Sequence, residues 1–224
     1  MIRTRVLMAC AGVVCLLLAG CASAPKTPSG LSVSDRLEPV PKGTGAFTYV
    51  DKSHDFSPYR RLLIEPVVVY TAADHGFGDI PDAERTRMAT FVDAQARLIL
   101  ASTQYPIATE PGPDVLRLRL TLVGMTPSRA MLQGMTYVIP VGAALNLVKG
   151  ASGGSGTFMG SVTLAGEFYD AMAGNLLAGF VATRSPNALN VTALSSAYEA
   201  AGQGVVSLLE DLRRRIDRPE NVRR

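Results

Sequence analysis

The stretch Val115-Leu116-Arg117-Leu118-Arg119-Leu120-Thr121-Leu122-Val123 alternates between apolar and polar side chains over most of its length. Such alternation is typical of a β-strand, because successive side chains point to opposite faces of a sheet. The alternation therefore predicts that the leucines form one buried face of the strand and that Arg117, Arg119 and Thr121 lie on the opposite face. We expect a half-buried strand at residues 115–123.

Four further segments surround this strand in the sequence. Residues 82–102 and 195–216 carry apolar side chains at helical spacing and predict two amphipathic helices. Residues 61–70 are dense in Leu, Ile and Val and predict a buried strand, in which Pro66 marks an edge or a bulge. Two apolar runs between residues 160 and 185 flank the short connection Ala-Met-Ala-Gly and predict a β-hairpin.

This order of elements predicts an α+β fold. We expect a single two-layer domain, with an antiparallel or mixed sheet and amphipathic helices packed on one of its faces. The expected boundaries are a signal peptide at 1–20, a tether rich in Pro, Ser and Gly at 21–45, a globular domain at 46–218 and a tail at 219–224. Within the tether, we expect that residues 29–40 can pack on the domain despite their loop composition.

The N-terminus has the pattern of an export signal. Arg3 and Arg5 precede an uncharged apolar run that is too short to span a bilayer comfortably. The run ends in Leu18-Ala19-Gly20-Cys21, which resembles the lipobox of bacterial lipoproteins. Two alternatives are an uncleaved short membrane helix and a soluble protein that is cut near residues 22–24.

The lipobox resemblance implies a covalent modification of Cys21. Its thiol would receive a diacylglycerol, a signal peptidase would recognise Leu18, Ala19 and Gly20 and cut before the cysteine, and the new amine would be acylated with a chain such as palmitate. Several acyl chains anchor a protein firmly in a membrane. Because Ala22 rather than Asp follows the cysteine, the resemblance implies an outer-membrane lipoprotein that faces the periplasm.

Charge and cysteine content limit the classes of function that we expect for this protein. Loss of Arg3 and Arg5 with the signal would leave 20 basic and 19 acidic residues, which argues against a nucleic-acid partner. The three cysteines are Cys10, Cys15 and Cys21, so the lipidated mature chain would have neither a free thiol nor a disulfide. We expect no cofactor other than the acyl chains on Cys21.

Two surfaces are candidates for binding. Arg117 and Arg119 lie on one face of their strand, where they form either an anion-binding surface or an ordinary solvated sheet face. Residues 131–149 form a long apolar stretch that Pro140 and Gly142 interrupt, and this stretch is either buried or exposed to a partner or a lipid. Its candidate contact residues are Met135, Tyr137, Val138, Ile139, Leu145 and Val148.

Catalytic and metal sites are less well supported. Residues 150–154 match the Gly-x-Ser-x-Gly pattern, but the expected strand–turn–helix context is missing and both histidines, His54 and His75, lie upstream of the serine. Asp74, His75 and Asp79 could ligate a metal, yet such residues are ordinary in turns and helix caps. We therefore expect neither a catalytic residue nor a metal site, and we do not expect an enzyme.

Several stretches together resemble a bacterial lipoprotein family known as domain of unknown function 3313. They are SGLSVSDRLEPV (29–40), FTYVDKSHDFSPYRRLLIEPVVVY (47–70), VLRLRLTLVGMTP (115–127), YVIPVG (137–142) and EFYDAMAGNLLAGFVA (167–182). The resemblance implies an envelope lipoprotein without an established activity. We expect a non-catalytic binding or structural module in cell-envelope assembly, with an envelope protein as its partner, and the alternative is a periplasmic carrier or sensor of lipids or amphiphiles.

Overall fold

The computed structural model describes residues 27–41, 45–126, 160–185 and 197–217. Along the chain these residues form the elements η2 (Ser34–Arg36), β1 (Glu38–Pro39), β2 (Phe47–Val50), β3 (Arg61–Ile64), β4 (Val68–Val69), α2 (Asp82–Leu100), β5 (Val115–Thr126), β6 (Ser161–Asp170), β7 (Leu176–Arg184) and α5 (Ala197–Ile216). The predicted signal peptide, the lipobox and the apolar stretch 131–149 lie outside the described residues.

All seven strands belong to one mixed sheet in the order β1-β2-β7-β6-β5-β3, and β4 pairs with β5 beyond the end of β3. Strands β3 and β4 run parallel to β5, and the other neighbours are antiparallel. The chain returns from β4 to β5 through α2, as a parallel connection requires. The predicted α+β domain with a mixed sheet is confirmed.

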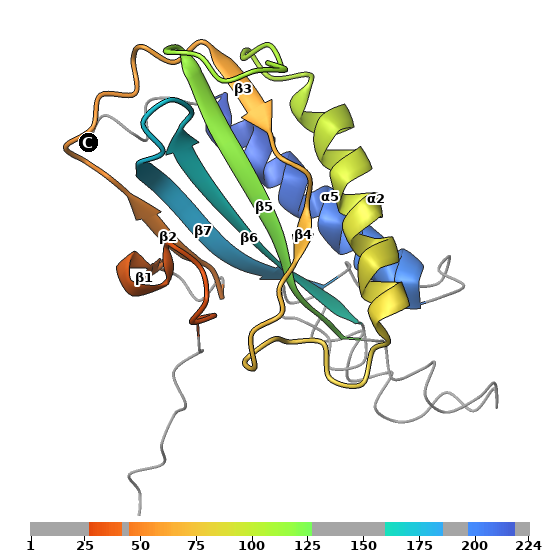
Figure 1. Cartoon of the computed structure of the whole chain (residues 1–224). Helices are drawn as coiled ribbons and strands as arrows, with labels where there is room; N and C mark the ends of the chain where they lie inside the picture. Colours follow the sequence, from red (N-terminus) through yellow and green to blue (C-terminus); the bar gives the residue numbers. More distant parts are fainter. Residues whose placement is uncertain (1–26, 42–44, 127–159, 186–196, 218–224) are drawn as a thin grey trace, which may run out of the picture.

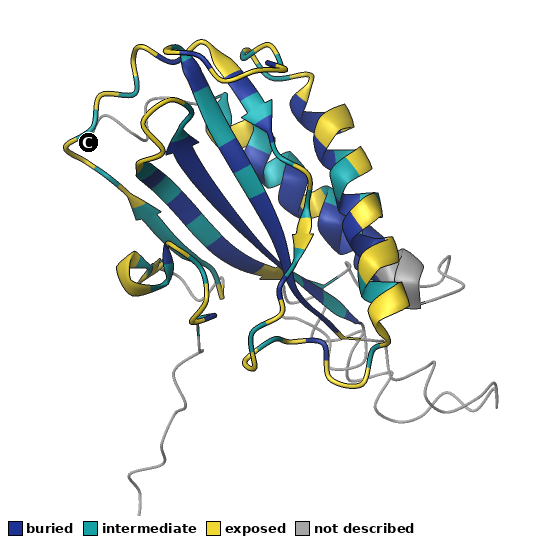
Figure 2. Cartoon of the chain, in the orientation of Figure 1, coloured by how far each residue is buried: buried dark blue, intermediate teal, exposed yellow. Residues whose placement is uncertain are grey.

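Helices α2 and α5 lie side by side over one face of the sheet (Figure 1). The predicted strand 115–123 is extended to twelve residues in β5, and Leu118, Leu120 and Leu122 are fully buried beneath the helices. The apolar side of each helix faces the sheet and is buried, and the charged side faces outward and is exposed (Figure 2). Burial of each such leucine side chain stabilises the fold by about 1.5–3 kcal/mol. The main apolar core therefore lies between the helices and the sheet.

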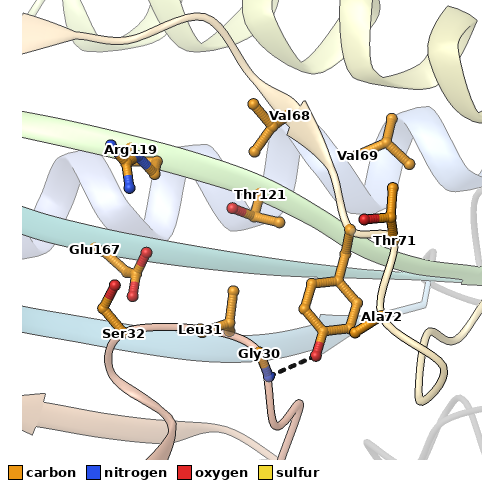
Figure 3. Close-up of a pocket in the computed structure, with 11 residues that line it drawn as sticks. Gly30, Leu31, Ser32, Val68, Val69, Thr71, Ala72, Arg119, Thr121 and Glu167 are labelled. Atoms are coloured by element: carbon orange, nitrogen blue, oxygen red, sulfur yellow. Dashed lines mark hydrogen bonds between the residues drawn. The ribbon is translucent and has the colours of Figure 1, made fainter.

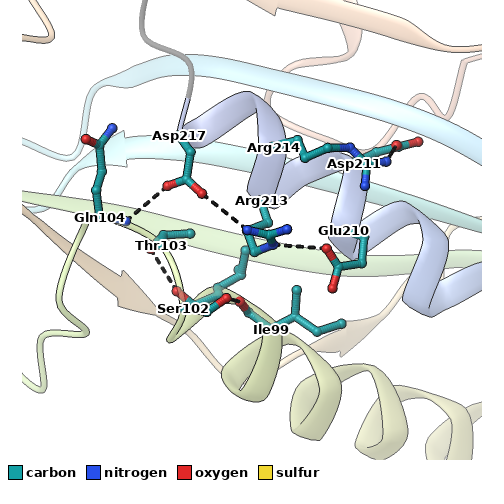
Figure 4. Close-up of polar contacts among 10 residues, drawn as sticks. Ile99, Ser102, Thr103, Gln104, Glu210, Asp211, Arg213, Arg214 and Asp217 are labelled. Carbon is teal, nitrogen blue, oxygen red and sulfur yellow. Dashed lines mark hydrogen bonds and ion pairs between the residues drawn. The ribbon is translucent and has the colours of Figure 1, made fainter.

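The C-terminal ends of the two helices are joined by polar contacts (Figure 4). The side chain of Asp217 accepts a hydrogen bond from the backbone N–H of Gln104, 3.0 Å away, just after α2. Asp217 also lies 3.6 Å from Arg213, which itself pairs with Glu210 at 2.9 Å. Arg213 and Arg214 at the end of α5 thus pair with neighbouring carboxylates in addition to lying at the negative end of the helix dipole.

The predicted strand at 61–70 is two short strands. Pro66 has no N–H to donate, and the chain leaves the ladder between Ile64 and Val68 before it rejoins β5. Glu65 follows Ile64, whose side chain belongs to the core under the helices, and successive side chains of a strand point to opposite faces. The side chain of Glu65 therefore lies on the other face of the sheet, beside the arginines of β5.

The stretch predicted as a tether contains folded residues. Val33 is fully buried, β1 and β2 extend the sheet beyond β7, and Phe47 to Val50 pair with β7. Packing against the domain therefore begins near residue 28 in the described part of the chain. Among the described residues, no helix combines the length and apolar character that a membrane span requires.

Candidate functional site

The sheet face opposite the helices carries a cluster of charged side chains, which we call the charged cluster: Glu65, Arg117, Arg119, Glu167 and Tyr169. Strand register explains why they meet, because Arg117 is directly opposite Tyr169 and Arg119 is directly opposite Glu167 on β6. Facing pairs in a sheet lie within side-chain reach. The cluster thus draws on β5, on β6 and on the gap between β3 and β4.

Glu65 is the shared partner of both arginines. Its carboxylate lies 2.7 Å from Nε of Arg119 and 3.3 Å from Nη1 of Arg117. The hydrogen bond to Glu65 raises the pKa of Arg119 above its ordinary value. Both guanidinium groups also lie over the ring of Tyr169, with centroid distances of 5.0 and 5.3 Å, which is favourable for cation–π contact.

Glu167 is the most deeply buried charged group of this face, with 3% of its surface exposed. Its carboxylate accepts a hydrogen bond of 2.9 Å from the backbone N–H of Val33. An ionised carboxylate is costly to bury without such partners. Arg119 is opposite Glu167 in the sheet and interacts with it electrostatically.

Residues 28–36 lie across this face, and we call them the strap. Val33 packs against Gly179 of β7 so closely that a Cβ atom on this glycine would lie 2.7 Å from the valine methyl group. At the other end of the strap, the N–H of Ser29 donates to Asp74 at 2.7 Å and the N–H of Gly30 donates to the hydroxyl of Tyr70 at 2.7 Å. The Tyr70 hydroxyl in turn donates to Asp74 at 2.8 Å.

A hollow of about 250 Å³ lies between the strap and the sheet (Figure 3). The strap contributes residues 30–32, β4 contributes its two valines, the segment after β4 contributes residues 70–72, and β5 and β6 contribute Arg119, Thr121 and Glu167. Opposite charges therefore face the same small space.

The two arginines predicted as an anion-binding pair do lie together, but they are engaged with Glu65. An anion that bound them would have to share or displace this carboxylate. Nε of Arg117 and the hydroxyl of Tyr169 are buried without a hydrogen-bond partner among the described residues. Burial raises the pKa of Tyr169, and its hydroxyl also interacts with the side chains of Ser32 and Glu167.

A second polar group fastens the opposite end of the sheet. Nε2 of His54 lies 3.0 Å from the hydroxyl of Tyr59, which donates to Asp170 at 2.7 Å. Burial is the main cause of the raised pKa of the Tyr59 hydroxyl, and the hydrogen bond to Asp170 is the second cause. Asp170 also accepts the N–H groups of Met172 and Ala173 in the β6–β7 turn. This arrangement holds the loop before β3 to the hairpin.

The other predicted site residues are placed as follows. Asp74 is engaged with the strap, and His75 accepts a 3.4 Å hydrogen bond from the N–H of Phe77. The described residues contain no group of three side chains that could hold a metal ion. Cys21, the residues before it, the serine motif at 150–154 and the six candidate contact residues in 131–149 are outside the described residues.

A family model described as "Protein of unknown function (DUF3313)" matches residues 27–212. The chain belongs to the DUF3313 family. The match begins at the residue before the strap and ends in α5, so the strap belongs to the DUF3313 domain rather than to a separate linker.

Further comparisons add little to the DUF3313 assignment. None of the curated proteins matches the chain. Among solved structures, a variant of the PelC dodecamer from Paraburkholderia phytofirmans is similar, with 13% identity, a TM-score of 0.38 and coverage of 75% of this chain and 95% of that one. A second PelC dodecamer from the same organism has 12% identity, a TM-score of 0.37 and coverage of 75% and 96%.

The two arginines of this DUF3313 domain were predicted from the sequence, as was packing of residues 29–40 on the domain, whereas Glu65, Glu167 and Tyr70 were missed. A signal was present for one of them, since Glu167 interrupts the apolar run of β6. The pairing of strands that brings Glu65 and Glu167 to the arginines is not encoded in any local pattern.

Removal of the charge on Glu65 should destabilise the domain. We expect Glu65→Gln to lower the free energy of unfolding by about 1–3 kcal/mol, because two partly buried guanidinium groups lose their shared partner. Urea denaturation of the mature chain measures this change. The exposed Glu110→Gln is the control and should change stability by less than about 0.5 kcal/mol. Equal effects of the two variants would contradict a structural role for Glu65.

Strap docking should depend on pH through Asp74. The N–H of Ser29, and then the Tyr70 hydroxyl, hold the pKa of Asp74 below its usual value. Because the folded-state pKa is the lower one, the contribution is complete above about pH 4 and is lost as the pH falls through the folded value. The NMR amide shifts of Ser29 and Gly30 should therefore change on acidification below about pH 4.

The same two amides should shift at neutral pH in Asp74→Asn, which removes the charge and keeps the size of the side chain. Asp79→Asn, in the same loop, is the matched control and should leave them unchanged. Unchanged amide shifts of Ser29 and Gly30 in the Asp74→Asn variant would show that Asp74 does not hold the strap.

Proposed function

We propose that this protein is an outer-membrane-anchored periplasmic lipoprotein that acts as a non-catalytic binding or structural module in cell-envelope assembly. The observation that supports this proposal most directly is the strap. The chain docks on the sheet within a few residues of Cys21, so an acylated Cys21 would hold the whole folded domain at a membrane surface.

The sequence supports the anchor. Leu18-Ala19-Gly20-Cys21 stands at the end of an uncharged apolar run that follows two arginines. Diacylglycerol on the thiol and an acyl chain on the amine together provide enough buried methylene groups for stable attachment. Ala22 after the cysteine favours the outer membrane over retention in the inner membrane.

The charged cluster supports a binding or structural role over catalysis. Glu65 is committed to two guanidinium groups, and Glu167 accepts the N–H of Val33. A general acid or base needs a group that is free to exchange a proton with a substrate. Here the carboxylates join segments of the chain, and the hollow beside them offers space for a small polar ligand or for a side chain of a partner.

The alternative function, a carrier or sensor of amphiphiles, depends on the apolar stretch 131–149. That stretch lies outside the described residues. The hollow next to the strap is small and partly charged, so it does not favour an acyl chain as its occupant. The binding module is therefore the function that the described residues support best.

The anchor is tested by Cys21→Ser. The variant should remain unacylated and uncut at residue 21, because serine lacks the thiol that receives the diacylglycerol. Intact-mass spectrometry and membrane fractionation measure the result. Cys15→Ser, inside the apolar run, is the matched control and should be processed normally. Acyl chains on the Cys21→Ser protein would refute the lipobox interpretation.

The partner is tested by in-cell crosslinking of the full-length lipoprotein, followed by mass spectrometry of proteins and lipids. We expect one reproducible envelope protein, recovered in lower yield from cells that express the mislocalised Cys21→Ser chain. A stoichiometric lipid in place of any protein partner would reject the binding module and favour the carrier.

A further inference from the structure

We infer that the protein contacts the lipid surface with one defined end of its sheet, the end that carries the loop of residues 71–81. This inference rests on the proposed anchoring at Cys21. It goes further by assigning which part of the domain faces the bilayer and how close to the bilayer that part is held.

The strap leaves the domain at one end of the sheet. Pro28 is buried, and the next two residues donate their N–H groups to Asp74 and Tyr70. Asp74 belongs to the loop that follows β4, and this loop continues to Gly76, which forms a bridge with Gly124 near the C-terminal end of β5. The chain toward Cys21 therefore departs from this end of the sheet.

The chain between the proposed anchor and the first docked residue is short. Seven peptide units separate Cys21 from Pro28, and a fully extended chain covers at most about 3.6 Å per residue, or roughly 25 Å here. A tether that reached to residue 45 would have allowed roughly 85 Å on the same basis. Docking of the strap thus restricts the domain to a thin layer above the bilayer.

The strands run from the end of the sheet that carries the 71–81 loop to the opposite end. Ser161 begins β6 beside Thr126, at the same end of the sheet as the 71–81 loop, and Asp170 ends β6 at the turn of the hairpin. Ten residues at about 3.4 Å each place this turn roughly 30 Å from the anchored end. The β6–β7 turn, with Met172 largely exposed, therefore points away from the membrane.

Two alanines provide a matched pair of probe positions. Ala73 is exposed in the loop beside Asp74, and Ala173 is exposed in the β6–β7 turn. Each is changed to cysteine in turn in the full-length lipoprotein. Because acylation consumes the thiol of Cys21 and the other two cysteines leave with the signal, the introduced thiol takes the donor fluorophore alone.

Each labelled protein is reconstituted in vesicles of phosphatidylethanolamine and phosphatidylglycerol that contain a headgroup-labelled acceptor lipid. The roughly 30 Å difference in height predicts about twofold or greater energy transfer from position 73 relative to position 173. Insertion of a 20-residue Gly-Ser linker after Ser23 leaves the strap intact and should abolish most of this difference.

The outcomes separate the inference from the proposed function. Failure of the protein to float with the vesicles would reject the anchor itself. Flotation with equal transfer from the two positions, or with greater transfer from position 173, would overturn the assigned orientation. Persistence of the full difference after the linker insertion would overturn the claim that the short connection sets the orientation.

Discussion

A carboxylate buried in the middle of a sheet has to be compensated, and the face of this domain opposite the helices is organised around Glu167. Arg119 faces it across the β5–β6 ladder, and Val33 supplies its backbone N–H from a segment that is remote in sequence. Burial of an ionised group without these partners would cost several kcal/mol. The strap is thus held by the hydrogen bond that stabilises the buried Glu167 carboxylate, and also by the packing of Val33 on Gly179.

The two faces of the sheet are stabilised in different ways. On the helix side, leucines of β5 meet apolar residues of α2 and α5, and burial of apolar surface dominates. On the strap side, a much smaller apolar cluster around Tyr70 and Val123 adjoins a network of ion pairs. Strand β5 takes part in both kinds of stabilisation, because its arginines lie on the strap side and the leucines that alternate with them pack in the main core.

Local patterns in the sequence predicted the elements that bury an apolar face. The helices were expected at 82–102 and 195–216 and are found at Asp82–Leu100 and Ala197–Ile216, because helical periodicity persists over many residues. Strands β1 and β2 were missed, since they are short and lack full burial. The expected strand at 61–70 was divided at Pro66, and the pairing partners of Glu65 and Glu167 depend on tertiary register, which no local pattern specifies.

The contact between Val33 and Glu167 spans 134 positions of the chain. The strap is among the first parts of the domain to leave the ribosome, whereas its partner strand is made near the end of synthesis. A segment with so few neighbours of its own cannot repay the entropy of ordering until β6 and β7 have paired. The N-terminal residues of the domain are therefore synthesised first, but they can dock only after β6 and β7 have been made.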